Sequence, residues 1–360
     1  MPKSLLRQTV SWFAMMVATA ACTAERGSAP PPILELAVAD GEVPVGNEPH
    51  LLALSDERVV ITAMGTHAVV VYDFERNTAD TVGRDGGGPG EFALPSAIGS
   101  WPDGRFTVLD EMLRRVTVIR ADLRIDTAFA YPNTEFALHV PTDAHNWIAT
   151  GVARVRDSIP LVRLTAPGGH HDTIALLATP HTQFIPLGNI AFNLPIEYAA
   201  RDVWGTLADG RLWIARGADN RVDWIGADGV PRHGVPFPFR SIRTTALDRK
   251  KVAGLPAPAI FDTVRREMSV EKAPFQHVVA AGNGSLWFWL NQPAGYTSEL
   301  YEIRSPDGNV VSQLRAPSGH KLMAISSKFL YFVGENSDGE WVLSRHQLPP
   351  VLKKCCSAFH

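Results

Sequence analysis

Residues 102–108 read Pro-Asp-Gly-Arg-Phe-Thr-Val, a tight turn followed by the start of an alternating strand. The same plan returns at residues 208–214, Ala-Asp-Gly-Arg-Leu-Trp-Ile, and at residues 282–288, Gly-Asn-Gly-Ser-Leu-Trp-Phe. Asp-Gly and Asn-Gly pairs suit hairpin turns because both residues tolerate positive φ angles. A turn-and-strand unit that recurs along the chain predicts a repeat architecture built from antiparallel strands.

Three weaker copies of the unit occur at residues 56–61, 144–148 and 326–331. When all six units are aligned on the glycine of the turn, this position falls at residues 57, 104, 144, 210, 284 and 327. The spacings of 47, 40 and 43 residues lie near the roughly 40–45 residues of a four-stranded propeller blade. The spacings of 66 and 74 residues require insertions, which we place at about residues 165–198 and 240–273.

The pattern predicts an all-β fold, a single six-bladed β-propeller of four-stranded antiparallel blades. Eight blades would need about 336 residues and would leave no room for the insertions. Residues 244–251 and 259–268 carry helical patterns, so we expect a short helical insertion near residues 240–273. We expect an N-terminal strand near residues 33–38 to close the ring beside residues 341–345, because an open ring exposes two sheet edges.

The best preserved stretch of the repeat lies at residues 83–95, Gly-Arg-Asp-Gly-Gly-Gly-Pro-Gly-Glu-Phe-Ala-Leu-Pro. It continues through Asp103-Gly104, Val108, Asp110 and residues 115–118, Arg-Val-Thr-Val. This pattern resembles the NHL repeat, and the chain looks similar to the six-bladed NHL-like propellers of bacterial exported lipoproteins. The resemblance implies that the glycine-rich segment connects the outer strand of one blade to the inner strand of the next. A phosphate-binding loop would need a helix after the glycines, whereas this segment leads into a strand.

The N-terminus has the plan of a bacterial lipoprotein signal. Lys3 and Arg7 precede an apolar run at residues 9–21, which is too short to span a bilayer as a helix and fits the apolar core of a secretory signal. The run ends in small residues directly before Cys22, which resembles the site where such signals are cleaved and the cysteine is acylated. Thr19 replaces the usual leucine, so cleavage with plain secretion, or an uncleaved anchor, are the alternatives.

The sequence therefore predicts four segments. Residues 1–21 form a signal peptide of the lipoprotein type, and residues 22–32 form a flexible tether rich in proline and small residues. Residues 33–350 form the six-bladed β-propeller, and residues 351–360 form a C-terminal tail. The expected location is the cell envelope, as a membrane-anchored lipoprotein that faces the periplasm or the exterior; a secreted soluble protein is the alternative.

The composition and charge of the chain exclude some classes of binding partner and of fold. The chain has 45% hydrophobic and 20% charged residues, which supports a large core. Its formal net charge is −3 and becomes −5 once residues 1–21 are removed. Because no run of Lys or Arg builds a cationic face, nucleic acid is not an expected partner. Three cysteines exclude a disulfide scaffold. The adjacent Cys355 and Cys356 rarely bridge each other without strain and are expected in a frayed tail.

Three histidines share one position of the repeat. His50, His277 and His320 each stand seven residues before the aligned turn position, in units that closure makes neighbours. This position falls early in the innermost strand, so the three imidazoles are candidate ligands of a Zn²⁺ ion. The arrangement is similar in plan to the propeller lyases that cleave peptidyl-hydroxyglycine. A polar ligand-binding mouth and a purely structural role are the alternatives, because a one-residue slip turns a strand side chain to the other face.

Two further groups of residues have ordinary interpretations. His170 and His171, next to Asp172, are expected in a solvated loop of the first insertion. Trp147, Trp213 and Trp287 occupy the same place in the second strand of three units. Large side chains at that place are expected to pack between sheets; a sugar-stacking platform is the alternative.

The sequence contains no serine-nucleophile elbow, Cys–His framework, paired zinc-cysteine motif or P-loop. The favoured hypothesis is an exported binding module that presents one face to a small molecule, a glycan or a protein. The alternative is a metal-dependent propeller enzyme, of the lyase or lactonase type, with its site at the central channel. Propellers host both functions, but the acidic residues that a calcium-dependent lactonase needs do not align at one repeat position.

Overall fold

The computed structural model divides the chain into two compact units, Met1–Pro31 and Pro32–His360. The residues that the structure describes all lie in the second unit: 33–37, 39–45, 49–62, 67–101, 104–130, 136–141, 146–151, 157–165, 170–187, 190–207, 209–226, 228–253, 266–336 and 338–352.

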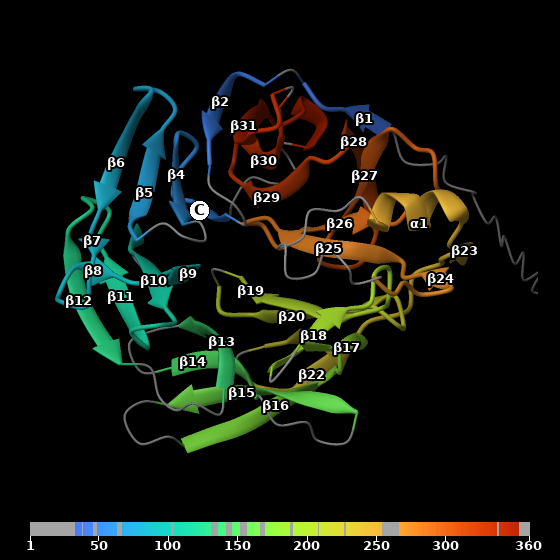
Figure 1. The fold of residues 1–360 in the computed structure, drawn as a ribbon, viewed down its shortest axis with the longest axis horizontal. Helices are drawn as coiled ribbons and strands as arrows, with labels where there is room; N and C mark the ends of the chain where they lie inside the picture. The colour runs from blue at the N-terminus through green and yellow to red at the C-terminus, as the bar shows by residue number, and fades with distance from the viewer. Residues whose placement is uncertain are drawn as a thin grey trace, which may run out of the picture. The chain divides into compact units, whose positions relative to one another are not determined.

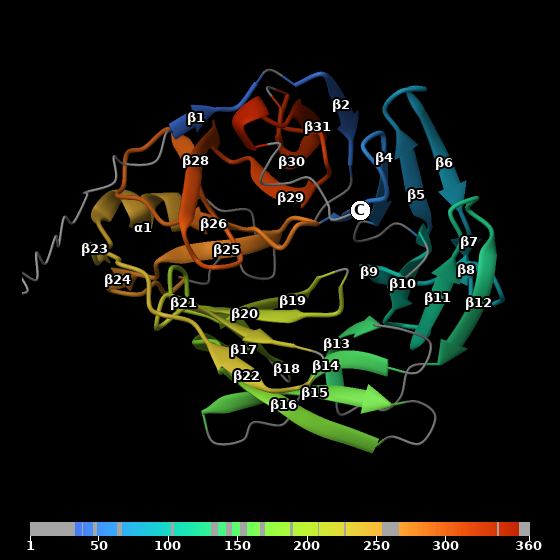
Figure 2. The same cartoon turned by 180° about the vertical axis from the view of Figure 1, so that it is seen from behind.

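Six antiparallel sheets follow one another along the chain, and each contains four consecutive strands or three strands completed by the N-terminus (Figures 1 and 2). Blades 1 to 3 are β3(His50–Ala53), β4(Arg58–Thr62), β5(Val69–Asp73), β6(Thr78–Val82); β9(Pro95–Ser100), β10(Phe106–Asp110), β11(Arg115–Ile119), β12(Ile125–Ala130); and β13(Phe136–Pro141), β14(Asn146–Gly151), β15(Ser158–Thr165), β16(His170–Ala178). Blades 4 to 6 are β19(Val203–Thr206), β20(Leu212–Arg216), β21(Arg221–Ile225), β22(Pro231–His233); β25(Phe275–Ala280), β26(Leu286–Leu290), β27(Ser298–Arg304), β28(Val310–Pro317); and β29(Lys321–Ile325), β30(Phe329–Glu335), β31(Trp341–Gln347). The predicted six-bladed β-propeller is therefore confirmed, and each aligned turn joins the first two strands of its blade.

The middle strands of the blades are apolar on both faces. In blade 2, every residue of β10 and all but the first residue of β11 are buried. A strand that is covered on both faces reads as a nearly continuous apolar run. The outer strands β6 and β12 are mostly exposed. Each blade is therefore covered by a neighbour on both sides and exposes only its rim.

The hydrophobic core consists of six clusters, one at each contact between successive blades. Trp287 belongs to the cluster between blades 5 and 6, and Trp213 belongs to the cluster between blades 4 and 5. Both indoles are buried, which confirms that they pack between sheets and excludes them as a sugar-stacking platform. The side chain of Trp147 lies outside the described part.

The ring is closed by a different strand from the one expected. β2(Gly41–Pro44) pairs antiparallel with β31, from Gly41 opposite Arg345 to Pro44 opposite Val342, and completes blade 6. β1(Ile33–Glu35) instead adds to blade 5, parallel to β28. The prediction that residues 33–38 close the ring was therefore wrong, because the next strand along the chain, β2, does so. The apolar segment at residues 33–37 forms its backbone hydrogen bonds with β28 of blade 5. The less apolar β2 pairs with β31 at the open edge of blade 6.

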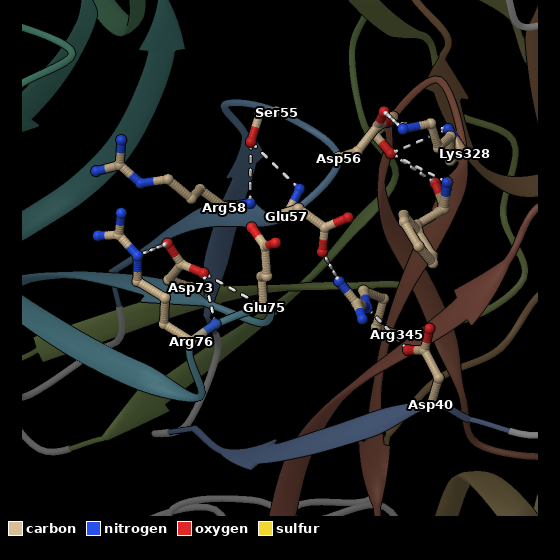
Figure 3. A network of polar contacts seen from close by, with 12 residues as sticks. Asp40, Ser55, Asp56, Glu57, Arg58, Asp73, Glu75, Arg76, Lys328 and Arg345 are labelled. Atoms are coloured by element: carbon tan, nitrogen blue, oxygen red, sulfur yellow. Dashed lines mark hydrogen bonds and ion pairs between the residues drawn. The ribbon is translucent and has the colours of Figure 1, made fainter.

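Polar contacts reinforce this closure where blade 6, β2 and blade 1 meet (Figure 3). The Arg345 guanidinium contacts Asp40, with a distance of 2.8 Å between Nε and Oδ1, and also the carboxylate of Glu57 in blade 1. Asp56 accepts hydrogen bonds from the Ser327 hydroxyl at 2.8 Å and from the Lys328 amide at 3.0 Å. Arg345 therefore joins the N-terminal segment, blade 6 and blade 1 through one side chain.

The glycine-rich segment is the expected connector from the outer strand β6 to the next inner strand β9. It contains two short strands, β7(Arg84–Asp85) and β8(Glu91–Phe92), which pair in parallel. Gly83 has a φ of 80°, and a Cβ there would lie 2.5 Å from the Phe92 ring, so only glycine fits. Asp110 accepts amide hydrogen bonds from Ala93 and Leu94, with distances of 2.7 and 3.2 Å. The residues that carry the repeat signature thus hold this connector against blade 2.

Two long insertions, residues 179–202 and 234–274, also connect an outer strand to the next inner strand. All such connectors leave the sheets at the same end of the antiparallel strands, which we call the connection face. The first insertion contains the hairpin β17(Thr182–Leu187) and β18(Ile190–Pro195). The second contains β23(Ile242–Arg243), α1(Ala246–Ala253) and β24(Glu271–Lys272). The helical insertion near residues 240–273 is confirmed by α1, whereas most of the second helical pattern lies outside the described residues.

The expected bounds of the first insertion, residues 165–198, need correction. β16 begins at His170, pairs with β15 along its whole length and forms the outer strand of blade 3. His171 and Asp172 therefore lie in a strand and not in the expected loop. No helix among the described residues is long and apolar enough to cross a membrane.

Ring closure by β2 predicts unequal effects of two N-terminal truncations. Removal of residues 1–45 deletes β1, β2 and Asp40, whereas removal of residues 1–36 deletes only β1. We expect the longer truncation to lower the melting temperature by roughly 10 °C more, because each kcal/mol shifts a domain of this size by about 2–4 °C. Circular dichroism melts check this, with removal of residues 353–360 as a control. Equal melting temperatures for the two N-terminal truncations would contradict closure by β2.

Candidate functional site

The structure places the three predicted metal ligands at equivalent ends of inner strands. His50 is the first residue of β3, His277 lies in β25, and His320 directly precedes β29. The inner strands of these blades contact one another, β25 with β29 and β29 with β3. Their placement along the strands therefore agrees with the repeat alignment.

The side chain of His320 is directed between blades 5 and 6. Its ring lies against Gly334 of β30, where a Cβ would approach the ring Cγ to 2.8 Å. His320, Ser344 and His346 line one cavity of about 640 Å³, which the N-terminal segment also borders. In that cavity the Nδ1 atom of His346 lies 2.7 Å from the Ala37 carbonyl oxygen, a hydrogen bond that fastens the N-terminal segment to blade 6.

His277 stands among cations. Burial, together with the charges of Lys321 and Arg201, lowers its pKa to about 3. Two cationic neighbours oppose the approach of a metal ion as much as that of a proton. Among the described residues, which include all three histidines, no group of three or more His, Cys, Asp or Glu side chains could hold a metal ion. A zinc ion shared by the three histidines therefore gains no support from the described residues.

The cysteines singled out in the sequence cannot be placed. Cys22, the predicted lipid-attachment residue, lies in the first unit and outside the described residues. Cys355 and Cys356 lie beyond residue 352, which is also outside the described part.

The two insertions pack together into one layer on the connection face, which we call the insertion cap: residues 181–187, 190–199, 242–253 and 266–273. The Glu197 amide donates to the Glu267 carbonyl at 3.0 Å, and the Ser269 amide donates back to the Glu197 carbonyl at 2.9 Å. The Ala273 amide donates to the Tyr198 carbonyl at 2.9 Å. Segments that are far apart in the sequence thus meet in an isolated parallel β-bridge between Glu197 and Met268.

A buried ion pair lies within the insertion cap. The Lys272 ammonium is 2.5 Å from the Asp248 carboxylate, and each side chain is only 3% exposed. Lys272 also donates to the Gln292 carbonyl of blade 5 at 2.7 Å, and its Nζ lies 4.6 Å from the centre of the Tyr198 ring. These contacts connect α1, β24 and blade 5 at one point.

Asp248 has a second role at the start of α1, in which it is the third residue. Its Oδ2 atom accepts a hydrogen bond from the Thr245 amide at 2.8 Å and from the Thr245 hydroxyl at 2.9 Å. This is the reciprocal capping arrangement of a helix N-terminus. Asp248 and Val252, one helical turn apart, are the buried residues of α1. The helix therefore packs against the rest of the protein through one narrow face.

Tyr198 is the strained residue of the site. Its φ is 60°, in the left-handed region that bulky residues rarely adopt and that costs about 1–3 kcal/mol. Burial, with the nearby charges of Asp248, Glu197 and Glu299, raises its pKa to about 12. The phenol therefore stays neutral at physiological pH and keeps its proton for donation.

Two cavities lie on either side of Lys272. The larger, of about 680 Å³, is lined by residues of the first insertion, of blade 4 and of the second insertion. The smaller, of about 130 Å³, is lined by Tyr198, Asp248, Asn291 and Glu299 among others. Asn291 is 5% exposed; its Nδ2 donates to the Ala273 carbonyl at 2.8 Å, but its Oδ1 has no partner within the described part. A buried acceptor without a partner costs about 1–3 kcal/mol, so a ligand or water in the smaller cavity would complete it.

Sequence reasoning missed Tyr198, Lys272 and Asn291 because none of them stands at a repeated position. One signal was present, since Thr245 and Asp248 have the spacing of a capping box and mark the start of α1. The long spacings of 66 and 74 residues correctly located extra structure around blade 4, but no local pattern shows that the two insertions meet.

No family model matches the sequence, and no curated protein matches it. Solved structures resemble the chain over most of its length. A putative exported protein from Bacteroides fragilis is 10% identical, with 88% of this chain and 94% of that chain covered and a TM-score of 0.49. A member of the DUF4221 family from Bacteroides vulgatus is 8% identical, with 86% and 97% covered and a TM-score of 0.47. The virginiamycin B lyase from Staphylococcus aureus is 12% identical, with 86% and 99% covered and a TM-score of 0.42. At such identities the function has to be argued from the residues of this chain.

Removal of one partner of the buried ion pair should be strongly destabilising. We expect Lys272→Met to cost about 3–5 kcal/mol, because the Asp248 carboxylate is left buried without its cation. The double variant Lys272→Met/Asp248→Asn should lose clearly less than the sum of the two single variants, since asparagine retains an acceptor for the Thr245 amide. A double-mutant cycle of urea unfolding measures the coupling. Strictly additive losses would show that the pair contributes no coupling energy.

Proposed function

We propose that the protein is an exported, lipid-anchored β-propeller that binds a small ligand in the two cavities beside Lys272. The observation that carries the proposal is the strained Tyr198, which lines the smaller cavity with its ring over a buried ion pair. Backbone strain of this kind clusters at functional sites, where the surrounding structure maintains it. The NHL-like signature of residues 83–118 supports the class of exported propeller, and the insertion cap supplies the site.

The size and lining of the cavities favour a small organic molecule or one unit of a glycan. A volume of about 680 Å³ lies within the usual range of ligand pockets, about 300–1,000 Å³. Phe237 and Phe239 offer apolar surface in the larger cavity. In the smaller cavity the neutral Tyr198 phenol can donate a hydrogen bond, and Asn291 Oδ1 can accept one. The matching ligand has both polar groups and an apolar face.

Ligand binding can be tested with the purified propeller, residues 33–352, and a panel of monosaccharides, short oligosaccharides, amino acids and organic acids. A compound that binds the folded protein should raise the melting temperature, and the rise should grow with the logarithm of its concentration above Kd. For such a compound, Tyr198→Phe and Asn291→Leu should each weaken binding by about fivefold to tenfold, the equivalent of one hydrogen bond.

Tyr72→Phe is the matched control, because it removes a hydroxyl that bonds to Asn77 in blade 1, remote from the insertion cap. It should change stability but leave the affinity as in the wild type. Compounds that bind Tyr198→Phe and Asn291→Leu as tightly as the wild type would place the binding site elsewhere.

The lipid anchor is a separate part of the proposal. We expect Cys22→Ala to move the protein from the membrane fraction to the soluble fraction, because the acylated cysteine would be its attachment point. Fractionation of cells, together with the mass of the N-terminal peptide, measures this. A wild-type peptide without lipid would replace anchoring by simple secretion, without any effect on the ligand site.

A further inference from the structure

Glu299 is a buried carboxylate that lines the smaller cavity. It is the second residue of β27 and is 5% exposed. Its Oε2 atom accepts a hydrogen bond from Nε1 of Trp289 at 2.9 Å, and its Oε1 atom accepts one from the Gly319 amide at 3.1 Å. Both donors are neutral, and no Lys, Arg or His among the described residues forms an ion pair with Glu299.

The other buried carboxylates of the described part are compensated. Asp73, Asp223 and Asp248 each form an ion pair with an arginine or a lysine. Asp110 has no such partner, but it accepts hydrogen bonds from three backbone amides. An ionised carboxylate has about four acceptor positions, and Glu299 uses two of them. It therefore keeps acceptor positions and lacks a cation to offset the cost of a buried charge.

The cations that line the smaller cavity do not supply this partner. The Lys272 ammonium is bound to Asp248 at 2.5 Å. Lys251 is an exposed residue of α1 and forms no ion pair within the part of the chain that the structure describes. Because Tyr296 is also exposed, at 55%, it and Lys251 form the rim of the cavity. The interior is left to residues such as Glu299.

Asn291 adds a second acceptor to this interior. It is 5% exposed, and its Nδ2 atom donates to the Ala273 carbonyl, which determines that the other end of the amide is the acceptor. That Oδ1 atom has no partner among the described residues. A carboxylate and an amide oxygen that both lack donors suit an ammonium group, which has three donors, no acceptor and a positive charge.

The larger cavity has a lining of the same sign. Its titratable side chains are His181, Asp219, Glu267, Glu271 and Lys272. Asp219 is paired with Arg221 and Lys272 with Asp248, whereas Glu267 and Glu271 form no ion pair within the described part. A cation is the ligand that such a lining attracts.

We infer that the ligand of this propeller is an organic cation, whose primary ammonium group binds the Glu299 carboxylate in the smaller cavity, beside Asn291. The inference rests on the proposed function for the cavities and adds the charge of the ligand. At about 130 Å³ the smaller cavity takes only the ammonium end. Lys272 lines both cavities, so the remainder of the ligand continues toward the larger one.

Matched pairs of an amine and an alcohol, titrated into the purified protein by calorimetry at pH 7 and equal ionic strength, test the charge. The pairs are propylammonium with 1-propanol and 2-phenylethylammonium with 2-phenylethanol. We expect saturable binding of the ammonium compounds, at least tenfold tighter than that of the alcohols, and at least tenfold weaker binding of the ammonium compounds to Glu299→Gln.

Glu340→Gln is the matched control, because it removes the same charge from an exposed residue that bonds to Asn336 in blade 6. It should bind as the wild type does. The comparison of amine with alcohol in the wild type needs no variant, so it remains decisive should Glu299→Gln fail to fold.

Ammonium compounds that bind no more tightly than the matched alcohols, or that bind Glu299→Gln like the wild type, would overturn the inference. Failure of the proposed function gives a different result. A neutral compound that needs Tyr198 and Asn291, yet is unaffected by Glu299→Gln, would support the proposed function and overturn the cation site. An amine that needs Glu299 but binds Tyr198→Phe and Asn291→Leu like the wild type would support the cation site and overturn Tyr198 and Asn291 as ligand-binding residues.

Discussion

Closure of the ring by β2 and Arg345 is the constraint on which the rest of the structure depends. Every blade buries both faces of its middle strands against neighbours, so a ring with one missing contact would expose the apolar faces of two blades. The contact between blades 6 and 1 is made by strands from opposite ends of the chain. Arg345 meets Asp40 and Glu57 there, and it lies over the rings of Phe74 and Phe329 at 4.6 and 4.2 Å. One mostly buried cation thus orders three segments that no local interaction would bring together.

A closed ring also gives the insertions a fixed base. Because blades 4 and 5 are locked between their neighbours, the segments that leave them can adopt conformations that would not persist alone. Tyr198 has an unfavourable φ, yet its carbonyl and the adjacent Glu197 amide and carbonyl are all bonded to the second insertion. The buried pair of Lys272 and Asp248 then determines where α1 lies on blade 5. Such pairs contribute little net stability compared with apolar packing. The main effect of this pair is therefore to fix the position of α1 on blade 5.

The repeated features of the fold could be predicted from the sequence, whereas the contacts between segments that are far apart in the chain could not. The six turns and the number of blades follow from a short local pattern that recurs in every blade, and the helical insertion follows from a local helical pattern of its own at residues 244–251. The direction of His320 does not follow, because it depends on Gly334, which makes room for the ring on a different strand. The closing strand was misplaced because residues 33–37 are more apolar than β2, although backbone pairing, not apolarity, decides which segment fills an open edge. Tyr198, Lys272 and Asn291 gain their significance only from contacts between two insertions, which no spacing within the chain encodes.

Two cations near the insertion cap, Lys272 and Arg201, have different kinds of partner. Lys272 is neutralised by Asp248 in a place that water scarcely reaches, so its charge organises the protein and offers little to a ligand. Arg201 is fixed by a carbonyl, a partner that orients a guanidinium without cancelling its charge. The difference has a physical consequence, since a buried neutral pair exerts only a short-range field, whereas a guanidinium that is bound to a carbonyl keeps its charge. In the proposed function, selection of a ligand by shape and hydrogen bonding belongs to the cavities beside Tyr198 and Asn291, where Lys272 adds no free charge.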